Sequence, residues 1–410
     1  MVGMPIAAGD LIYDPSDPRM AIDPYPVYAE LRERAPYPRD PFGSPVFTRF
    51  ADCEAILRSG QVSSDFRNSN EFARMEASGE EIPMIDSMPE GRPFLFLDPP
   101  DHSRLRGLVS KAFTPRVIEG LRPRVLSLVD ELLGAAAARG GLEVIEDFAY
   151  PLPVIVISEM LGVPPEDHEQ FKAWSRVLAR ALDPAFMATQ EQIQERLQAF
   201  MEFAQYFFGL FAARRAEPQD DLITALVQAE EAGDKLTEAE LLSTCILLLV
   251  AGHETTVNLI GNGVLALLRN PDEAARWRAD RSLTKNAIEE ILRYDPPVQL
   301  TGRVALTDLE ISGHVIPKGE QAVLLIGSAN RDAEQFPEPD RLDLGRADAR
   351  HLSFGFGIHH CLGAPLARLE GQLALEAFVS RFPGARLAGP EPRYKDNVVL
   401  RGLASLPVSL

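Results

Sequence analysis

Phe354-Gly-Phe-Gly-Ile-His-His-Cys-Leu-Gly363 places one cysteine, Cys361, between a glycine-rich loop and a helical pattern over about residues 362–382. The partial positive charge of a helix start and nearby backbone N–H groups both stabilise a thiolate, so we expect a lowered pKa for this thiol. The glycines would let the backbone approach the sulfur and a flat cofactor closely. These features favour a thiolate ligand to iron. A buried, inert cysteine in a turn is the alternative, and other parts of the chain must decide between the two.

The composition is that of a globular, negatively charged protein. With 410 residues and 46% hydrophobic content, the chain can bury a large core. Helical patterns continue without a flexible linker or a repeat, so we expect residues 1–410 to form a single domain. The net charge of −19 argues against general nucleic-acid binding, because a phosphate backbone would be repelled.

The N-terminus and the cysteines indicate a cytoplasmic protein. Residues 1–8 carry no basic residue, and their apolar run is too short for a signal-peptide core or a membrane anchor. The three cysteines, Cys53, Cys245 and Cys361, are far apart in the sequence. They make neither a disulfide framework nor a Cys-x-x-Cys metal knuckle, which suits a reducing compartment.

Apolar spacing predicts mostly helices, and the longest one is central. Thr237-Glu-Ala-Glu240 is a capping-box sequence, and the apolar pattern that follows lasts to Asn270, before Pro271. Its first half is apolar on nearly all sides, which predicts a buried helix. β-Branched segments predict short strands over residues 303–326 and near 394–409. The polar stretch 61–101 predicts a long loop.

Polar residues interrupt this apolar helix at Ala251-Gly-His-Glu-Thr-Thr256. Glycine costs about 1 kcal/mol relative to alanine inside a helix, and a carboxylate in an apolar interior needs partners. The hydroxyl of Thr255 can bond back to the carbonyl of Ala251, which would bend or widen the helix. A kink with a buried salt bridge would also explain the pattern. Residues that break local rules in a core nevertheless favour a function.

A second charged motif, Glu290 and Arg293, lies just before two prolines that end a helix. Because the two residues are three apart, they share a helix face and can pair. Pairs of this kind are common and contribute little at a surface, so the motif by itself is weak evidence.

In this order, these segments resemble the cytochrome P-450 family of haem-thiolate monooxygenases over almost the whole chain. The cysteine signature of that family, Phe-x-x-Gly-x-His/Arg-x-Cys-x-Gly, is matched from Phe354 to Gly363. The oxygen-activating segment, Ala/Gly-Gly-x-Asp/Glu-Thr, is matched from Ala251 to Thr255. Each motif by itself is a modest signal for this family, but their combination is specific to it.

The resemblance extends to the charged motif. The Glu-x-x-Arg pair of the family falls on Glu290 and Arg293, and Arg341 takes the position of the usual third partner. We therefore expect these three residues to form a structural ion-pair cluster.

The resemblance implies a mainly α-helical fold with small β-sheets, shaped as a triangular prism. Haem b would lie between the long central helix and the helix after the cysteine. Cys361 would be the axial metal ligand, because a thiolate pushes electron density onto iron. Glu254 and Thr255 would be catalytic and deliver protons for dioxygen activation. The residues expected to bind the haem propionates are His102, Arg106, Arg303 and His359. The other residues expected to contact haem are Ala251, Gly252, Phe354, Gly357, Cys361 and Gly363.

The resemblance also implies protein partners. No flavin or iron–sulfur motif remains in the chain, so electrons from NAD(P)H would arrive through a separate ferredoxin reductase and ferredoxin. A basic stretch could steer an acidic ferredoxin, although a solvated helix face would look the same. The basic residues concerned are Arg104, Arg106, Lys111, Arg116, Arg122 and Arg124, with Arg368 on the helix after the cysteine.

The expected substrate is a lipophilic small molecule that is hydroxylated or epoxidised, because the pocket implied by family position is mostly apolar. A polyketide, a terpenoid, a steroid or a fatty acid would each fit. The pocket would be lined by residues 84–96, parts of 170–200, Leu247, Val250, Ala251, Gln299, Leu300 and Val399.

Two other functions stay open at this point. A haem protein could sense ligands, or use peroxide directly without electron partners. A structural protein could instead bind zinc through His351, His359, His360 and Cys361, because histidine and cysteine are preferred zinc ligands. Three adjacent ligands cannot easily form a tetrahedron, which counts against the zinc site.

Overall fold

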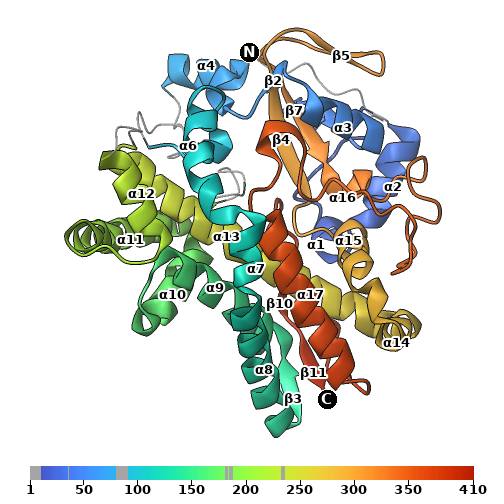
Figure 1. The fold of residues 1–410 in the computed structure, drawn as a ribbon. Helices are drawn as coiled ribbons and strands as arrows, with labels where there is room; N and C mark the ends of the chain where they lie inside the picture. The colour runs from blue at the N-terminus through green and yellow to red at the C-terminus, as the bar shows by residue number, and fades with distance from the viewer. Residues whose placement is uncertain (1–10, 36, 80–90, 181–182, 184–187, 232–235) are drawn as a thin grey trace.

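The computed structural model describes residues 11–35, 37–79, 91–180, 183, 188–231 and 236–410 (Figure 1). The helices are α1 (Pro18–Ile22), α2 (Tyr25–Arg34), α3 (Phe50–Arg58), α4 (Asn70–Ser78), α6 (Asp101–Ser110), α7 (Pro115–Gly120), α8 (Arg122–Arg139), α9 (Pro151–Leu161), α10 (His168–Ala179), α11 (Gln190–Ala216), α12 (Leu222–Glu231), α13 (Glu238–Arg269), α14 (Pro271–Ala279), α15 (Thr284–Tyr294), α16 (Ile326–Ala329) and α17 (Ala364–Arg381). The strands are β1 (Val46–Phe47), β2 (Val62–Ser63), β3 (Gly141–Glu143), β4 (Leu300–Ala305), β5 (Leu309–Ile311), β6 (His314–Ile316), β7 (Gln321–Leu325), β8 (Arg386–Leu387), β9 (Arg393–Tyr394), β10 (Leu403–Ser405) and β11 (Pro407–Ser409). The expected mainly helical fold with small sheets is confirmed.

Helix α13 is the central element, and its start is set by local chemistry. The hydroxyl of Thr237 accepts from the backbone N–H of Glu240, and the Glu240 carboxylate accepts from the backbone N–H of Thr237. This is the capping box expected from the sequence. The helix ends at Arg269, and α14 begins at Pro271, which needs no N–H donor there. Both ends therefore agree with the sequence to within one residue.

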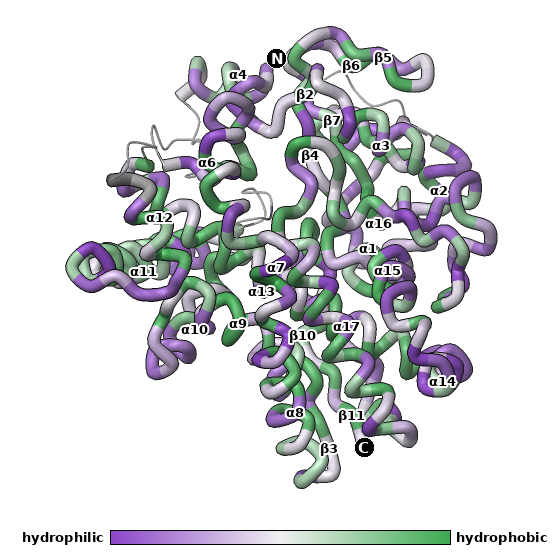
Figure 2. The backbone as a smooth tube through the Cα atoms, in the orientation of Figure 1, coloured by the Kyte–Doolittle hydropathy of each residue, from purple (hydrophilic) through white to green (hydrophobic). Residues whose placement is uncertain are grey.

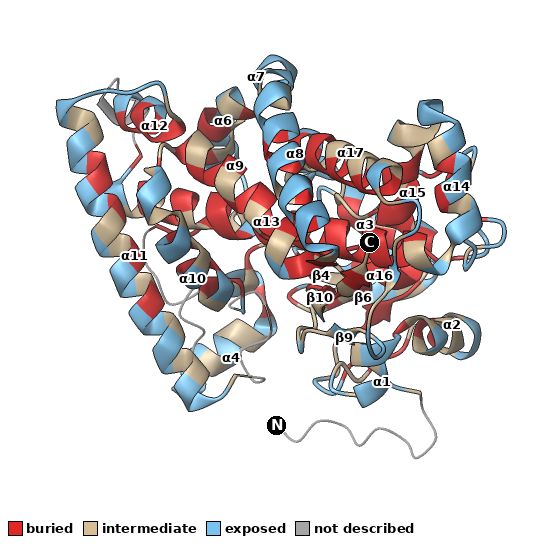
Figure 3. Cartoon of the chain, turned by 90° about the horizontal axis from the view of Figure 1, so that it is seen from below, coloured by how far each residue is buried: buried red, intermediate tan, exposed pale blue. Residues whose placement is uncertain are grey.

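Most of α13 is buried, apart from its two ends and the turn around Ala251. Figure 3 shows the buried residues concentrated along α13, α17 and α15. The helix is long and apolar enough to cross a membrane, but 78% of its most apolar stretch is buried inside the protein. It is therefore the core helix of the fold. Figure 2 shows hydrophilic residues on the peripheral helices α2 and α14 instead.

Other helices pack around α13 and bring the cysteine loop to it. Helix α9 packs along the first half of α13, and α17 packs against α13, α15 and α8 (Figure 1). The close contact with α17 requires glycine. A Cβ at Gly263 would lie 2.7 Å from a methyl group of Leu375, and a Cβ at Gly371 would lie 3.0 Å from a methyl group of Leu259. The helix that follows Cys361 therefore lies directly against the central helix.

Four small sheets complete the fold. The largest has the strand order β1-β7-β4-β2, with β1 parallel to β7 and the other pairs antiparallel. The smaller sheets have the orders β3-β11-β8, β9-β10 and β5-β6. In the largest sheet, Arg303 on β4 lies opposite Ala322 on β7. The hairpin formed by β9 and β10 lies near α13, because β10 also packs against that helix.

Two predictions about local structure are wrong. Residues 61–101 were expected to be loop, but they contain β2 and α4. The hydroxyl of Ser69 caps the start of α4, and Gly79 ends it in the left-handed conformation at φ 72°. The strand expected up to Ile326 ends at Leu325, because α16 begins at the next residue. Both helices are short, so their periodicity is too weak to recognise in the sequence.

The expected ion-pair cluster is present, but its third side chain differs. The carboxylate of Glu290 accepts from Nε of Arg293 at 2.7 Å and from Nη2 at 2.9 Å, and both side chains are fully buried. Nε of Arg346 donates to the same carboxylate at 3.0 Å. We call Glu290, Arg293 and Arg346 the Glu290 cluster.

Arg341 is therefore not the third partner of Glu290. Its side chain is 56% exposed and pairs with Glu338 at 3.2 Å. Only its backbone carbonyl reaches the cluster, where it accepts from Arg293 and from Arg346. The chain turns between residues 341 and 346, and this turn brings the later arginine inward.

This correction predicts unequal effects of two arginine substitutions on stability. We expect Arg346→Ala to lower the unfolding free energy by about 3 kcal/mol, because a buried carboxylate loses one of its two cations. Arg341→Ala keeps the backbone carbonyl and should cost less than about 0.5 kcal/mol. Guanidinium unfolding of the haem-loaded protein measures both. Equal losses for the two variants would contradict the assignment.

Candidate active site

Cys361 lies at the end of a tight loop that leads into α17. Its backbone N–H donates to the carbonyl of Phe354 at 2.8 Å, which closes the loop. Gly357 has φ 70°, and a Cβ there would lie 2.8 Å from the carbonyl oxygen of Leu57. Glycine at 357 is therefore required by the turn and by close packing on α3. By contrast, a Cβ at Gly363 would meet no protein atom within 4 Å. The packing of the protein alone therefore does not require glycine at position 363.

The pKa of the Cys361 thiol is raised in the protein alone, so the expected lowering is wrong. Desolvation raises this pKa, and it outweighs the backbone N–H groups of Gly363 and Ala364 and the positive charges of Arg106 and Arg368, which all act to lower it. The predicted helix-start donors are present, but the protein packed around the sulfur has the larger effect. Cys361 still has accessible surface, whereas Cys53 and Cys245 are buried. Of the three cysteines, only Cys361 can reach a ligand.

Four basic side chains converge near Cys361 from separate elements, as predicted. His102 and Arg106 lie on α6, Arg303 on β4, and His359 in the loop before the cysteine. The rings of His102 and His359 have centroids 4.3 Å apart. Arg106 donates to the backbone carbonyl of His360 and interacts electrostatically with Cys361.

These basic groups lack acidic partners in contact with them. Both ring nitrogens of His102 and Nε2 of His359 are buried without a hydrogen-bond partner among the described residues. Arg303 donates only to Thr301 and to the carbonyl of Gly302. Burial lowers the pKa of Arg303 to about 10, although Asp98 opposes this. Burial, followed by the charge of Arg303, lowers the pKa of His359 to about 3.

Buried donors that repel one another and have no acceptor fit a ligand with two carboxylates. Buried polar groups almost always have partners, so unpaired ones need an explanation. The haem propionates are two such carboxylates, and they would accept hydrogen bonds from His102, Arg303 and His359. The donors and Cys361 therefore fit haem.

On the distal side, Thr255 forms the hydrogen bond predicted from the sequence. Its Oγ1 donates to the carbonyl of Ala251 at 3.0 Å. The expected widening is absent, because α13 remains α-helical from Glu238 to Arg269. Gly252 has a packing role: a Cβ there would already lie 3.3 Å from Ile157 on α9. Ala251 is exposed and Thr255 is half-buried, so this turn of α13 has an open side.

Glu254 is buried and ionised. Its Oε1 is in contact with Nζ of Lys395, and its Oε2 lies 3.5 Å from Nε2 of His253. Burial alone would raise the pKa of Glu254, but hydrogen bonding to His253 and the charge of Lys395 lower it to about 2. The buried salt bridge that was weighed as a structural alternative is therefore present. Its partner, Lys395, was not predicted.

The predicted substrate-pocket residues do not all meet. Leu247 and Val250 are buried on α13. The backbone N–H of Gln299 donates to the carbonyl of Val399 at 2.9 Å, which brings these two residues together. The side chain of Gln299, however, bonds to Tyr28 and to the carbonyl of Pro296, and it lines a cavity of about 330 Å³ beside the N-terminal segment. Leu300, Leu247, Val250 and Val399 do not line that cavity. Of the predicted segments, residues 84–90, 181–182 and 184–187 lie outside the described residues.

Sequence reasoning also missed a buried acid on the helix after the cysteine. Glu370 on α17 is fully buried, and no donor reaches either of its oxygens at hydrogen-bonding distance among the described residues. Burial raises the pKa of Glu370 to about 8, although nearby Thr256 opposes this. An acid in helical register with Leu366 and Leu369 was the available sequence signal. Lys395 gave no such signal, because its partner is distant in the sequence.

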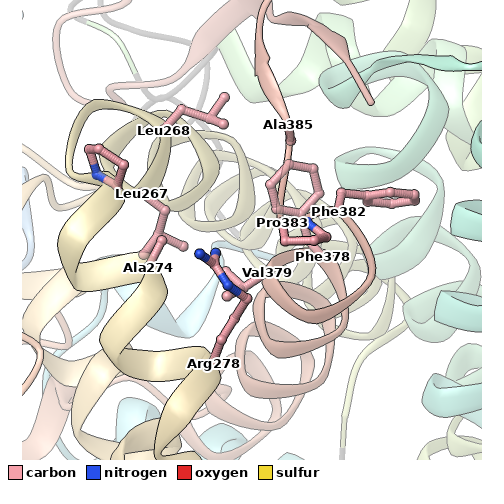
Figure 4. Close-up of a pocket in the computed structure, with 10 residues that line it drawn as sticks. Leu267, Leu268, Ala274, Arg278, Phe378, Val379, Phe382, Pro383 and Ala385 are labelled. Atoms are coloured by element: carbon pink, nitrogen blue, oxygen red, sulfur yellow. The ribbon is translucent and has the colours of Figure 1, made fainter.

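A separate hollow is unrelated to these residues. Figure 4 shows residues that line a space between the last turn of α13, α14 and the end of α17. The volume of this space is about 60 Å³. It lies at the opposite end of α17 from Cys361, and no predicted site residue lines it. Its lining is mainly apolar, with Arg278 as the charged residue.

The zinc alternative finds no support. Within the described part of the chain, no group of three or more His, Cys, Asp and Glu side chains could hold a metal ion. His351 instead lies 3.3 Å from a carboxylate oxygen of Glu289, so it has its own partner away from Cys361.

Comparisons with known proteins agree with this geometry. The profile of the family described as Cytochrome P450 matches residues 67–402. The chain is 43% identical over 399 residues to Cytochrome P450 107B1 of Saccharopolyspora erythraea, covering 96% of each protein. It is 42% identical over 413 residues to the polyketide biosynthesis cytochrome P450 PksS of Bacillus subtilis, covering 98% of this chain and 99% of that protein. The ligand-free structure of CYP164A2 from Mycobacterium smegmatis superposes with a TM-score of 0.86 at 47% identity, covering 96% of this chain and 98% of that one. This chain belongs to the cytochrome P450 family, the haem-thiolate monooxygenases.

Proposed function

We propose that this monooxygenase inserts one oxygen atom of dioxygen into a lipophilic small molecule, by hydroxylation or epoxidation. The observation that carries the proposal is the set of unpaired donors beside Cys361. Three of them, His102, Arg303 and His359, are held near the cysteine by separate elements and have no acidic partner in contact. Such a site is built for a dianionic cofactor with a thiolate ligand.

The residues on the cysteine side bind and orient the cofactor. When bound, haem supplies the activation of dioxygen and the transfer of oxygen to carbon. Cys361 binds the iron as a thiolate, because a metal cation at the sulfur favours the anion despite the raised pKa of the thiol. His102, Arg106, Arg303 and His359 bind the propionates, which relieves their mutual repulsion.

Glu254 and Thr255 hold and move protons on the distal side. The hydroxyl of Thr255 donates to the carbonyl of Ala251, so its oxygen can accept a hydrogen bond from a water molecule on the open side of α13. Glu254 is one residue earlier and is connected to Lys395, which is partly exposed. Together they form a path for protons between solvent and the haem pocket.

The lipophilic substrate class is supported by the apolar helix and by a relative. Leu247 and Val250 are buried apolar residues one turn before Ala251. PksS carries polyketide biosynthesis in its name, and the chain matches it over nearly its full length. A screen of polyketides, terpenoids, steroids and fatty acids for the absorption change of haem on substrate binding would identify the class.

Electrons would reach the haem from a separate ferredoxin in the cytoplasm, reduced by its own reductase, and residues 1–410 would be a single haem domain.

The surface that docks the ferredoxin must involve fewer basic residues than the basic stretch of the sequence contains. Arg104 pairs with Glu240, Arg122 with Glu119, Arg124 with Glu159, and Arg368 with Glu289. Among the described residues, no acidic side chain pairs with Lys111 or Arg116, and Arg106 donates to the backbone next to Cys361. Helix α7, which carries Arg116, packs on α17. Lys111 and Arg116 are therefore the proposed docking charges.

The proton role predicts uncoupling when the hydroxyl at 255 is removed. We expect Thr255→Ala to reduce the product formed per NADH consumed by roughly tenfold, with more peroxide released, because protons arrive without a positioned hydroxyl. Thr255→Ser keeps the hydroxyl and serves as the control. Unchanged coupling in the alanine variant would refute the role of Thr255. Efficient turnover with peroxide and none with a ferredoxin would instead support the peroxide-driven alternative.

The docking face predicts an effect that depends on salt. We expect Arg116→Glu to slow haem reduction by a bacterial ferredoxin at low ionic strength, with the difference shrinking as salt screens the charges. Arg124→Glu is the matched control, since Glu159 already neutralises Arg124, and it should slow reduction less. Stopped-flow reduction under carbon monoxide measures both rates. Equal rates for Arg116→Glu and the unaltered protein would exclude this face.

A further inference from the structure

Lys395 is held in place by three parts of the structure. Its backbone N–H donates to the carbonyl of Gly402 at 2.9 Å, inside the hairpin of β9 and β10. Its Nζ is in contact with Oε1 of Glu254 and lies 3.4 Å from Oδ1 of Asn258, one turn further along α13. Gly402 leaves room for that asparagine, because a Cβ at 402 would lie 1.8 Å from Oδ1 of Asn258. The lysine is therefore fixed against the central helix.

The next residues of the same segment are held as well. The carboxylate of Asp183 accepts from Nδ2 of Asn397 at 2.6 Å and from the backbone N–H groups of Val398 and Val399. A side chain beyond the end of α10 thus holds the turn that carries Lys395. Because of this second attachment, the fold itself fixes the position of the lysine.

The ion pair decides where the carboxylate of Glu254 points. One oxygen contacts Lys395 and the other lies 3.5 Å from Nε2 of His253, so the close contact is the one with Lys395. Among the described residues, no hydrogen bond joins Glu254 to Thr255, whose hydroxyl bonds to Ala251 instead. The carboxylate therefore faces the hairpin rather than the neighbouring threonine.

Lys395 also connects this buried acid to an opening. The cavity of about 330 Å³ between the N-terminal segment and the hairpin is lined by Lys395, Asp396 and Asn397. The Lys395 side chain is 24% exposed, whereas that of Glu254 is 7% exposed. The lining includes charged and amide side chains as well as apolar ones, and this volume is compatible with several waters. The lysine stands between the cavity and the acid.

We propose that Lys395 is a positioning residue for proton delivery: it holds Glu254 ionised and turned toward the cavity beside the hairpin. This inference rests on the proposed role of Glu254 in the proton path. The physical reason is that a buried carboxyl group prefers its neutral form unless a cation is next to it. Lys395 supplies that cation at the end of the path that reaches solvent.

The other charged groups near Glu254 cannot replace the lysine. His253 is the neighbour on the same helix, and its Nδ1 is already within 2.6 Å of the carbonyl of Leu249. Tyr150, which precedes α9, lies with its ring 5.5 Å from that of His253, and Arg176 on α10 stacks on the far face of Tyr150. Arg176 pairs with Glu146 at the surface. Among the described residues, only Lys395 brings a cation into contact with Glu254.

The test compares Lys395→Met with Lys395→Arg in the haem-loaded enzyme. We expect Lys395→Met to lower the product formed per NADH by about tenfold and to shift the pH dependence of coupling upward, because burial then raises the pKa of Glu254. Lys395→Arg keeps the cation and should retain the pH profile. Arg393→Met removes an exposed cation from the same hairpin and should change neither quantity. The inference fails if Lys395→Met matches the unaltered enzyme, or if Arg393→Met causes an equal loss.

An infrared measurement tests the same inference without turnover. At neutral pH, we expect a carbonyl band of a protonated carboxyl group, additional to any band of the unaltered protein such as that of Glu370, to appear in Lys395→Met and to vanish when Glu254→Gln is added. Absence of that band in Lys395→Met overturns the inference. Glu254→Gln alone distinguishes a wrong role for Glu254 from a wrong role for Lys395. If it keeps full coupling, the proposed relay through Glu254 is wrong. If it uncouples while Lys395→Met does not, only the role of Lys395 is wrong.

Discussion

The buried charge of Glu290 is the constraint on which the cysteine side of the molecule depends. Arg293 pairs with it on the same helix, and the remaining guanidinium N–H groups of Arg293 reach the carbonyl of Asn330 at 2.9 Å, far along the chain. The amide of Asn330 in turn accepts from the backbone N–H of Leu352 and donates to Ser353. The next residue, Phe354, closes the loop on Cys361. Because an unpaired buried charge is costly, this network holds the otherwise irregular chain before the cysteine in one conformation.

The second organising feature is electrostatic imbalance in the interior. The protein carries a net charge of −19, and most of its surface arginines have an acidic partner nearby. The donors next to Cys361 are the opposite case, since both ring nitrogens of His102 and Nε2 of His359 are buried without a hydrogen-bond partner among the described residues. Burial, followed by repulsion from Arg303, lowers the pKa of His359 and disfavours its charged form in the protein alone. A ligand with two carboxylates removes that repulsion, so cofactor binding and folding should support each other.

The two faces of the site solve different physical problems. The cysteine side must stabilise an anion in a place where desolvation raises the pKa of the thiol, and it uses backbone N–H groups, Arg106 and the metal itself. The distal side must accommodate a carboxylate inside an apolar helix. That carboxylate, Glu254, is placed against a lysine from the C-terminal hairpin. The buried acid of the central helix is therefore paired with a lysine that lies 141 residues away in the sequence.

The sequence by itself determined the features that depend on neighbouring residues. The ends of α13, its capping box, the back-bond of Thr255 and the pairing of Glu290 with Arg293 all follow from spacings of three or four residues, which helix geometry converts into contacts. Tertiary structure alone decided which distant side chains complete each group. It placed Arg346 rather than Arg341 next to Glu290, Lys395 next to Glu254, and Glu159 next to Arg124. The pKa of Cys361 is also raised, whereas the sequence predicted that it would be lowered. The reason is that desolvation depends on how many atoms surround a group, and this number cannot be read from spacing along the chain.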